Sequence, residues 1–166
     1  MLPPQELTAN HAPLDVAAFS AGVPLVAPAA ELAFEAVVDV GEMYDLGFGP
    51  LGHRRIVPIL GGRFQGPAIT GVVLPGGADR QLLRADGIRL LEAVYELRTD
   101  DGAVLSVTNR VTVDGVVAEG GYARSVVDVV APEGPHDWLN RRVLVGTLHP
   151  LAPARQAVLV RVFVLT

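Results

Sequence analysis

Three consecutive polar residues, Asp79, Arg80 and Gln81, follow the apolar run Ala68–Leu74 and a Pro-Gly-Gly turn. A carboxylate at the mouth of a barrel can act as a general base, and a neighbouring guanidinium can stabilise an anion or an enolate. The pattern therefore predicts Asp79 and Arg80 as catalytic groups and Gln81 as a substrate-binding group. An Asp beside a tight turn can also cap that turn by accepting backbone N–H bonds, and the two roles can coexist.

A second group of polar residues contains Trp138 and Asn140. Trp138 is the only tryptophan of the chain and can stack on a planar substrate, while Asn140 can hydrogen-bond to a substrate carbonyl. This interpretation makes Trp138 a substrate-binding residue and Asn140 a catalytic residue that stabilises negative charge. The alternative is a core tryptophan that closes one end of a barrel, with Asn140 fixing a loop.

Further candidates lie on or beside predicted strands. Tyr95 and Asn109 lie on neighbouring strands and are predicted to bind substrate. Glu92 is a competing catalytic base: facing a dry interior its pKa would be raised, whereas facing outward it would only add solubility. Arg54, in the basic cluster 53–55, can bind a carboxylate or phosphate, although a solvated loop also explains the cluster.

The segments that carry these residues are predicted to be β-strands. Short β-branched runs are separated by turn signals such as Gly61-Gly62, Asp86-Gly87 and Asp114-Gly115, and Asp-Gly between alternating segments is typical of hairpins. Hairpin spacing with hardly any helix predicts an all-β fold, an antiparallel and calycin-like β-barrel with a cavity for one small ligand. The ten expected strands are Ala33–Val40, Arg55–Leu60, Gly62–Gln65, Ala68–Leu74, Arg80–Ala85, Arg89–Leu97, Val104–Val113, Tyr122–Val130, Val143–His149 and Ala157–Leu165.

The first 30 residues have a different character from the rest of the 166-residue chain. They are rich in Pro and Ala and follow neither the helical nor the strand period. We expect an extended arm over residues 1–30, with one short helical turn near Asp15–Ser20, and a single barrel domain over residues 31–166. The apolar passage 25–34 favours an arm that packs on a neighbouring subunit over a disordered tail.

Composition narrows the classes of function. Apolar residues make up 50% of the chain and the mean hydropathy is +0.38, which predicts a large interior, a lined cavity or an oligomer interface. The absence of cysteine and lysine excludes disulfides, thiolate chemistry and lysine Schiff bases. A net charge of −5 without a large basic cluster argues against nucleic-acid binding.

Other observations bear on membranes, metals and cofactors. The sequence has no apolar run of about 18 residues, so we expect no transmembrane helix. It also lacks the basic amino-terminal region of a signal peptide, which predicts a cytoplasmic location. The four histidines lack the spacing of metal ligands, so we expect no metal site. No glycine-rich nucleotide-binding loop precedes a helix, so we expect no cofactor.

Four motifs resemble the domain of unknown function 3237 family, also called UPF0311: RRIVPI-x-GG, LPGGAD, LRTDDG and WLN. The resemblance covers Leu32 to Leu165. It implies a small antiparallel β-barrel that often self-associates, with some relatives acting without a cofactor on polyketide-like substrates. In the family LPGGAD is usually followed by Trp, whereas Arg80 stands here. If this position lines the pocket, a cation has replaced an aromatic side chain in the pocket wall.

Together these features predict a cofactor-independent cyclase or isomerase of natural-product, polyketide-like biosynthesis. The barrel would bind an apolar substrate and promote ring closure by holding a reactive conformer, with acid/base assistance. The alternatives are a barrel that binds a hydrophobic small molecule without chemistry, or a structural oligomer with a filled interior. The expected partners are an apolar small molecule and further copies of the chain in a homo-oligomer.

Overall fold

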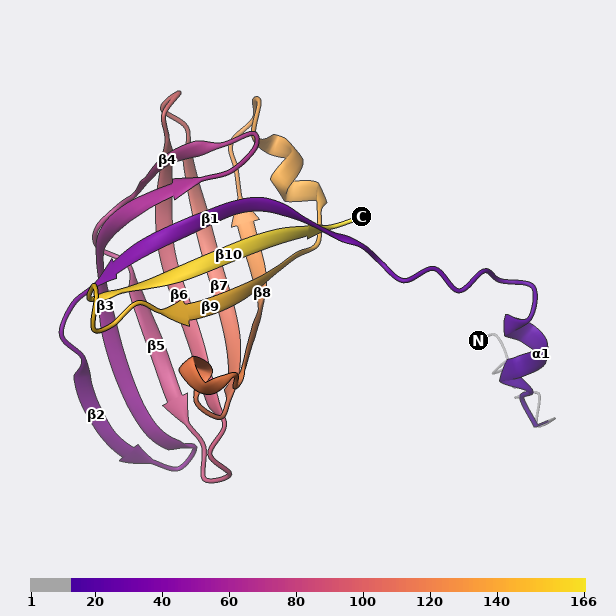
Figure 1. Ribbon diagram of the computed structural model, residues 1–166, viewed down its shortest axis with the longest axis horizontal. Helices are drawn as coiled ribbons and strands as arrows, with labels where there is room; N and C mark the ends of the chain where they lie inside the picture. Colours follow the sequence, from indigo (N-terminus) through magenta and orange to yellow (C-terminus); the bar gives the residue numbers. More distant parts are fainter. Residues whose placement is uncertain (1–12) are drawn as a thin grey trace, which may run out of the picture.

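Strict alternation of buried and exposed side chains shows how this sequence builds a barrel. Every second residue of β7 (Val104–Asp114) and β8 (Tyr122–Val130) is buried, so each strand presents one apolar face. A twisted sheet whose apolar faces all lie on one side can bury them by curling until its first and last strands pair. The computed structural model, which describes residues 13–166, is such a closed antiparallel barrel (Figure 1).

The described part of the chain contains ten strands, one short α-helix and two 3₁₀ turns. In chain order these are α1 (Val16–Ser20), β1 (Ala30–Val40), β2 (Tyr44–Gly49), β3 (Gly52–Gln65), β4 (Thr70–Val73), β5 (Ala78–Leu83), β6 (Arg89–Thr99), β7, η1 (Val117–Glu119), β8, η2 (Asp137–Arg141), β9 (Leu144–Pro150) and β10 (Ala157–Leu165).

The barrel closes between β1 and β3. Around the circumference the strands follow the order β1, β10, β9, β8, β7 and β6, and β1 pairs back onto β3. Two short strands, β4 and β5, together fill the position between β3 and β6. The strand β4 pairs with the carboxyl-terminal halves of β3 and β6, and β5 pairs with their amino-terminal halves.

The glycine pair Gly61-Gly62 lies inside one continuous strand, which corrects the turn expected there. Both residues have positive φ angles, 139° and 143°, and the β1–β3 register shifts beside them between Asp39 and Val40. A Cβ on Gly62 would lie 2.0 Å from the carbonyl oxygen of Val37. Glycine is therefore needed for close strand contact, and the pair bends β3 around the barrel instead of reversing it.

One end of the barrel is filled with side chains. Phe34 and Phe64 meet edge to face there, with ring centroids 5.7 Å apart, in a cluster that includes Leu97 and Leu139. Trp138 of η2 packs against the same cluster. The cavity described below lies toward the other end, which carries η1 and the loop that precedes β10.

The prediction of an all-β antiparallel barrel is confirmed, with one strand missed. Two expected strands, Arg55–Leu60 and Gly62–Gln65, are parts of the single strand β3, and β2 was not expected. The sequence of β2, YDLGFG, contains two glycines and an aspartate, and its side chains are mostly exposed. Such a segment carries little strand signal of its own and is held by pairing with β3.

The segment before β1 lies outside the barrel. Every side chain from residue 13 to residue 29 is exposed, including Phe19 and Leu25, and Figure 1 shows this segment leading away from the sheet. Asp15 caps α1 by accepting a hydrogen bond of 3.2 Å from the amide of Ala18. The homo-oligomer in which such an arm would pack on a second copy stays a prediction. No helix in residues 13–166 has the length and apolarity that a membrane span requires.

Candidate functional site

A cavity of about 280 Å³ occupies the open half of the barrel. Exposed residues at its rim, including Met43, Ala152 and Gln156, mark the mouth, and Tyr95 is a buried residue of the lining. A volume near the lower end of the range for ligand pockets suits one small molecule. The structure thus contains the cavity that the barrel interpretation of the sequence expected.

The walls of the cavity differ in chemistry. The side formed by β1, β9 and β10 is apolar, with Val38, Leu148, Val158 and Val160 among its residues. The opposite side, formed by β5, β6 and β7, carries Asp79, Gln81, Arg89, Tyr95 and Asn109. A bound molecule therefore meets an apolar wall, formed by β1, β9 and β10, on one side. On the other side it meets a polar wall, formed by β5, β6 and β7, which carries the hydrogen-bonding groups.

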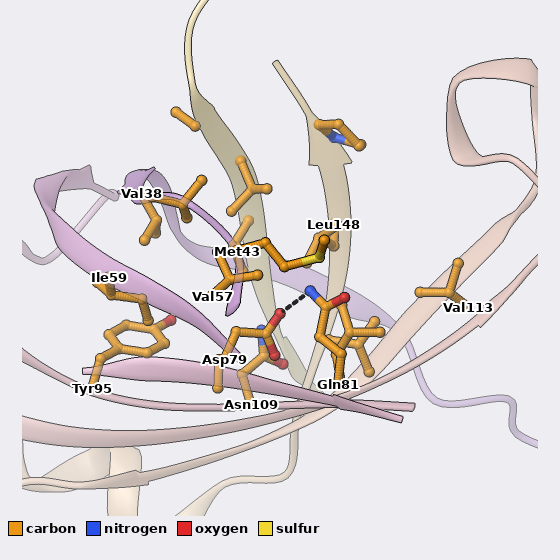
Figure 2. A pocket seen from close by; sticks show the side chains of 18 of the residues that line it. Val38, Met43, Val57, Ile59, Asp79, Gln81, Tyr95, Asn109, Val113 and Leu148 are labelled. Atoms are coloured by element: carbon orange, nitrogen blue, oxygen red, sulfur yellow. Dashed lines mark hydrogen bonds between the residues drawn. The ribbon is translucent and has the colours of Figure 1, made fainter. Parts of the chain in front are cut away.

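Strand register explains why the polar groups meet. Asp79 of β5 lies opposite Ala93 of β6, and Ala93 lies opposite Asn109 of β7. Directly paired residues share one face of the sheet, so all three side chains point inward. Because Ala93 is small, it leaves room in front of the strands between Asp79 and Asn109, and Figure 2 shows both of these side chains beside Gln81.

Among residues 13–166, Asp79 is the only carboxylic acid in the cavity lining. Its Oδ2 accepts a hydrogen bond of 2.7 Å from Nε2 of Gln81, drawn in Figure 2, while its Oδ1 is buried without a partner. Burial raises the pKa of Asp79 above its ordinary value, and the hydrogen bond from Gln81 offsets part of that rise. A carboxyl group with one free oxygen and a raised pKa is better suited to take up and return a proton than an ordinary, fully ionised carboxylate.

Tyr95 and Asn109 also hold unsatisfied polar atoms. They are 2% and 1% exposed, and neither the Tyr95 hydroxyl nor Asn109 Oδ1 has a hydrogen-bond partner within the described part of the chain. Burial raises the pKa of Tyr95, so the phenol stays protonated and can donate. Buried polar groups without partners are costly, and their presence in a ligand-sized cavity suggests that a bound molecule supplies the missing partners.

Three predicted site residues lie on the outside of the barrel. Arg80 and Arg54 are exposed, because they alternate with inward-facing neighbours on β5 and β3. Glu92 faces outward on β6 and accepts a hydrogen bond of 3.1 Å from Arg110. The position where the family usually has Trp is therefore part of the outer surface, and Arg80 does not change the wall of the cavity.

Trp138 and Asn140 lie at the filled end of the barrel, away from the cavity. The Asn140 amide makes two hydrogen bonds to the backbone of Ala131: its oxygen accepts from the amide N–H, and its nitrogen donates to the carbonyl, each at 2.9 Å. The side chain thus substitutes for a strand partner at the end of β8 and fixes the loop that leads to η2. This arrangement matches the loop-fixing alternative for Asn140.

We expect Asn140→Ala to lower stability and leave the cavity unchanged. The substitution removes both partners of Ala131, which is 7% exposed, and an unsatisfied buried backbone group costs about 1–3 kcal/mol. Denaturant unfolding should show a loss of this order, with unaltered affinity for cavity ligands in the folded protein. A variant of wild-type stability that has lost ligand affinity would contradict this role.

Sequence reasoning missed several residues of the lining, of which Arg89 is the most polar. Alternation along β6 offered a signal: Leu91, Ala93 and Tyr95 share one face, and extending this face by two residues reaches Arg89. Gln156 and Met43 offered no such signal because they lie in loops. Among residues 13–166 no group of three His, Asp or Glu side chains is arranged to hold a metal ion.

Comparisons with known proteins agree with this architecture. A UPF0311 protein of Rhodopseudomonas palustris is 46% identical over 76 residues, which span 46% of this chain and about half, 50%, of the relative. The crystal structure of a conserved protein of unknown function from the same species matches with a TM-score of 0.78 and 30% identity, covering 85% of this chain and 99% of the other.

Two further solved structures share the fold. A β-barrel-like protein of Acinetobacter baumannii matches with a TM-score of 0.77 and 26% identity, covering 87% of this chain and 99% of that one. An enzyme of Penicillium herquei matches with a TM-score of 0.70, at the same coverage of 87% and 99%; at 23% identity this likeness shows the fold alone.

The family model described as "Protein of unknown function (DUF3237)" matches residues 28–165, which include every strand of the barrel. The chain therefore belongs to the DUF3237 family, as its sequence motifs suggested.

Proposed function

We propose that this barrel is a cofactor-independent isomerase or cyclase that binds an apolar small molecule in its cavity and moves a proton with Asp79. The observation that carries the proposal is the one carboxyl group that the described residues place in a mostly apolar cavity, with a buried oxygen that has no partner among them. The Penicillium herquei enzyme contributes only the fold to this argument. The polyketide-like class of substrate follows from the family resemblance and is part of the proposal.

The proposed reaction starts with proton removal. The ionised Asp79 takes a proton from a hydroxyl group, or from a carbon next to a carbonyl group, of the bound molecule. The electron pair of the broken bond stays on the substrate as an alkoxide, phenolate or enolate. The polar wall that carries Asp79 also carries two donors, the Tyr95 hydroxyl and the side-chain N–H of Asn109. These donors stabilise the developing negative charge.

The proton then returns to the substrate. In an isomerisation, Asp79 donates it to a different atom of the enolate. In a cyclisation, the substrate oxygen bonds to an electron-poor carbon of the same molecule, and Asp79 protonates the atom that receives the displaced electron pair. Either route leaves Asp79 ionised again and gives a product with the elemental formula of the substrate, so no co-reactant is consumed.

The shape of the cavity supports catalysis by positioning. The apolar wall of Val38, Leu148 and Val158 would hold a flexible chain or ring system against the polar wall. Holding two reacting parts of one molecule in contact can supply about 7–11 kcal/mol in favourable cases. Because water is largely displaced from an occupied cavity, the hydrogen bonds to the intermediate are also stronger than in solution.

The test is incubation of the protein, without added cofactors, with a small-molecule extract of the cells that produce it, in D₂O buffer. We expect one compound to decrease while an isomer of it, one deuterium heavier when the proton returns to carbon, increases with time. The control is the same incubation with heat-denatured protein. A compound that is retained by the protein and released unaltered would contradict catalysis and favour a binding protein.

A further inference from the structure

Arg89 is a half-buried cation in the lining of the cavity. It is the first residue of β6 and lies opposite Leu83, the last residue of β5, and Val113, near the end of β7. Arg89 therefore lies at the edge of the polar wall. Within the described range 13–166, no carboxylate oxygen lies within 4.0 Å of its guanidinium, and its side chain makes no hydrogen bond. A guanidinium is charged at every physiological pH, so this charge lacks a counter-ion in the protein.

Arg89 differs from the other arginines of the barrel in its position. On the outer surface, Arg110 binds Glu92 and Asp128, whereas Arg80 and Arg98 are exposed to solvent and make no ion pair within residues 13–166. Arg89 also has no carboxylate partner among these residues, but it is half-buried and lines the cavity, where a ligand can reach it.

Asp79 is not the partner of Arg89, although both line the cavity. The pKa of Asp79 responds to burial and to the hydrogen bond from Gln81, and no arginine lowers it. Arg89 and Ala93, which lies beside Asp79, are four residues apart on β6, or about 13 Å along the strand. The two side chains are therefore far enough apart to contact different parts of an elongated molecule.

Arg55 is the other inward-facing arginine of this region, and it is a weaker candidate for ligand binding. It lies opposite Gln81 on β3, and its Nε is buried without a partner. It also lies opposite Asp45 of β2, and it does not belong to the cavity lining. Of the residues that the structure describes, the cavity lining thus offers one cation, Arg89.

We propose that the ligand of this cavity is an apolar molecule with a carboxylate, which Arg89 binds at the mouth while the apolar body reaches inward to Asp79. A guanidinium matches a carboxylate with two parallel N–H···O bonds, which fixes orientation as well as affinity. Entry in the reverse orientation would place the carboxylate beside Asp79 and Tyr95, where it would lack a cation. This inference depends on the proposed function only in placing the ligand in the same cavity.

The experiment compares two probes of equal shape, 2-naphthoate and 2-naphthamide, by calorimetric titration of the full chain at pH 7.5. Wild-type protein should bind the carboxylate at least about tenfold more tightly than the amide, as expected for a charge-assisted bond. Arg89→Met should reduce this ratio to about one without changing the affinity for the amide. Arg89→Lys keeps the charge but loses the paired geometry, so it should retain a part of the preference.

The matched control is Arg80→Met, which removes a cation from the outer face of the adjacent strand. It should leave the preference at its wild-type value, because a long-range effect of net charge would appear in both variants. Equal affinity for the two probes in the wild-type protein, no binding of either, or a preference that survives in Arg89→Met would each overturn the proposal. A clear preference for 2-naphthoate together with unaltered metabolites in the D₂O experiment would overturn only the catalytic function.

Discussion

Asp79→Asn should abolish turnover and at the same time make the protein more stable at neutral pH. The substitution removes the group that accepts and returns the proton, and loss of such a group lowers rates by about 10²- to 10⁴-fold. Asn keeps an oxygen that can accept the hydrogen bond from Gln81 Nε2, so the local geometry is preserved. The rate loss would therefore report chemistry, while ligand affinity stays within a few-fold of wild type.

The gain in stability follows from the raised pKa of Asp79. In the unfolded chain this carboxyl group titrates near its ordinary value of 3.8, and in the folded protein it titrates at higher pH. The folded wild-type protein therefore binds this proton more tightly than the unfolded chain does. The stabilisation that results is complete below the unfolded pKa, and the wild-type protein loses it as pH rises through the folded pKa. The size of the linked change in unfolding free energy grows with the difference between the folded and unfolded pKa values.

Unfolding measured at a series of pH values checks this linkage. The difference in unfolding free energy between Asp79→Asn and wild type should grow in favour of the variant from about pH 4 upward and then level off. Asp114→Asn is the matched control, because Asp114 is exposed at the end of β7 and makes no ion pair within residues 13–166. A difference that does not change with pH, or full turnover in Asp79→Asn, would contradict the assignment.

Ala93→Leu should remove ligand binding without destabilising the barrel. Ala93 lies between Asp79 and Asn109 and leaves the space that a substrate would occupy in front of them. A leucine there would extend into this space, and we expect affinity for 2-naphthoate to fall by at least about 100-fold, since a ligand and a buried side chain cannot overlap. Filling an existing cavity creates little overpacking, so the melting temperature should stay the same or rise.

The matched control for this substitution is Val94→Leu. Val94 is the next residue of β6, but it is 39% exposed on the outer face. Titration with 2-naphthoate and thermal unfolding should both match wild type in this control. Retained affinity in a stable Ala93→Leu variant would show that the probe binds elsewhere, and the cavity would lose its assignment as the ligand site.

The fold could be predicted because its signals are local. Alternation in β7 and β8 and the Asp-Gly turns define strands and hairpins within a few residues of sequence. The pair Gly61-Gly62 was misinterpreted because positive φ angles serve both turns and bent strands, and only the contact with Val37 on β1 distinguishes the two. The strand β2 was missed because its stability comes from pairing with β3.

The site could be predicted only in part, for a reason of geometry. The sequence showed which residues share a face but gave no sign of which face points inward, so Glu92 stayed a competing candidate for the base beside Asp79. The closed barrel places Asp79 inside and Glu92 outside. Asn140 was beyond prediction because its partner, the backbone of Ala131, is defined only by the loop that the side chain holds.

The most direct test of a proton-transferring Asp79 needs no substrate. Carboxyl ¹³C chemical shifts of aspartate-labelled protein, followed from low to high pH, give the pKa of each side chain, and the signal missing in Asp79→Asn identifies Asp79. We predict a midpoint for Asp79 clearly above its ordinary value of 3.8, because burial disfavours its charged form. A midpoint at or below that value would mean a carboxylate stably ionised in the cavity and would contradict the proposed role.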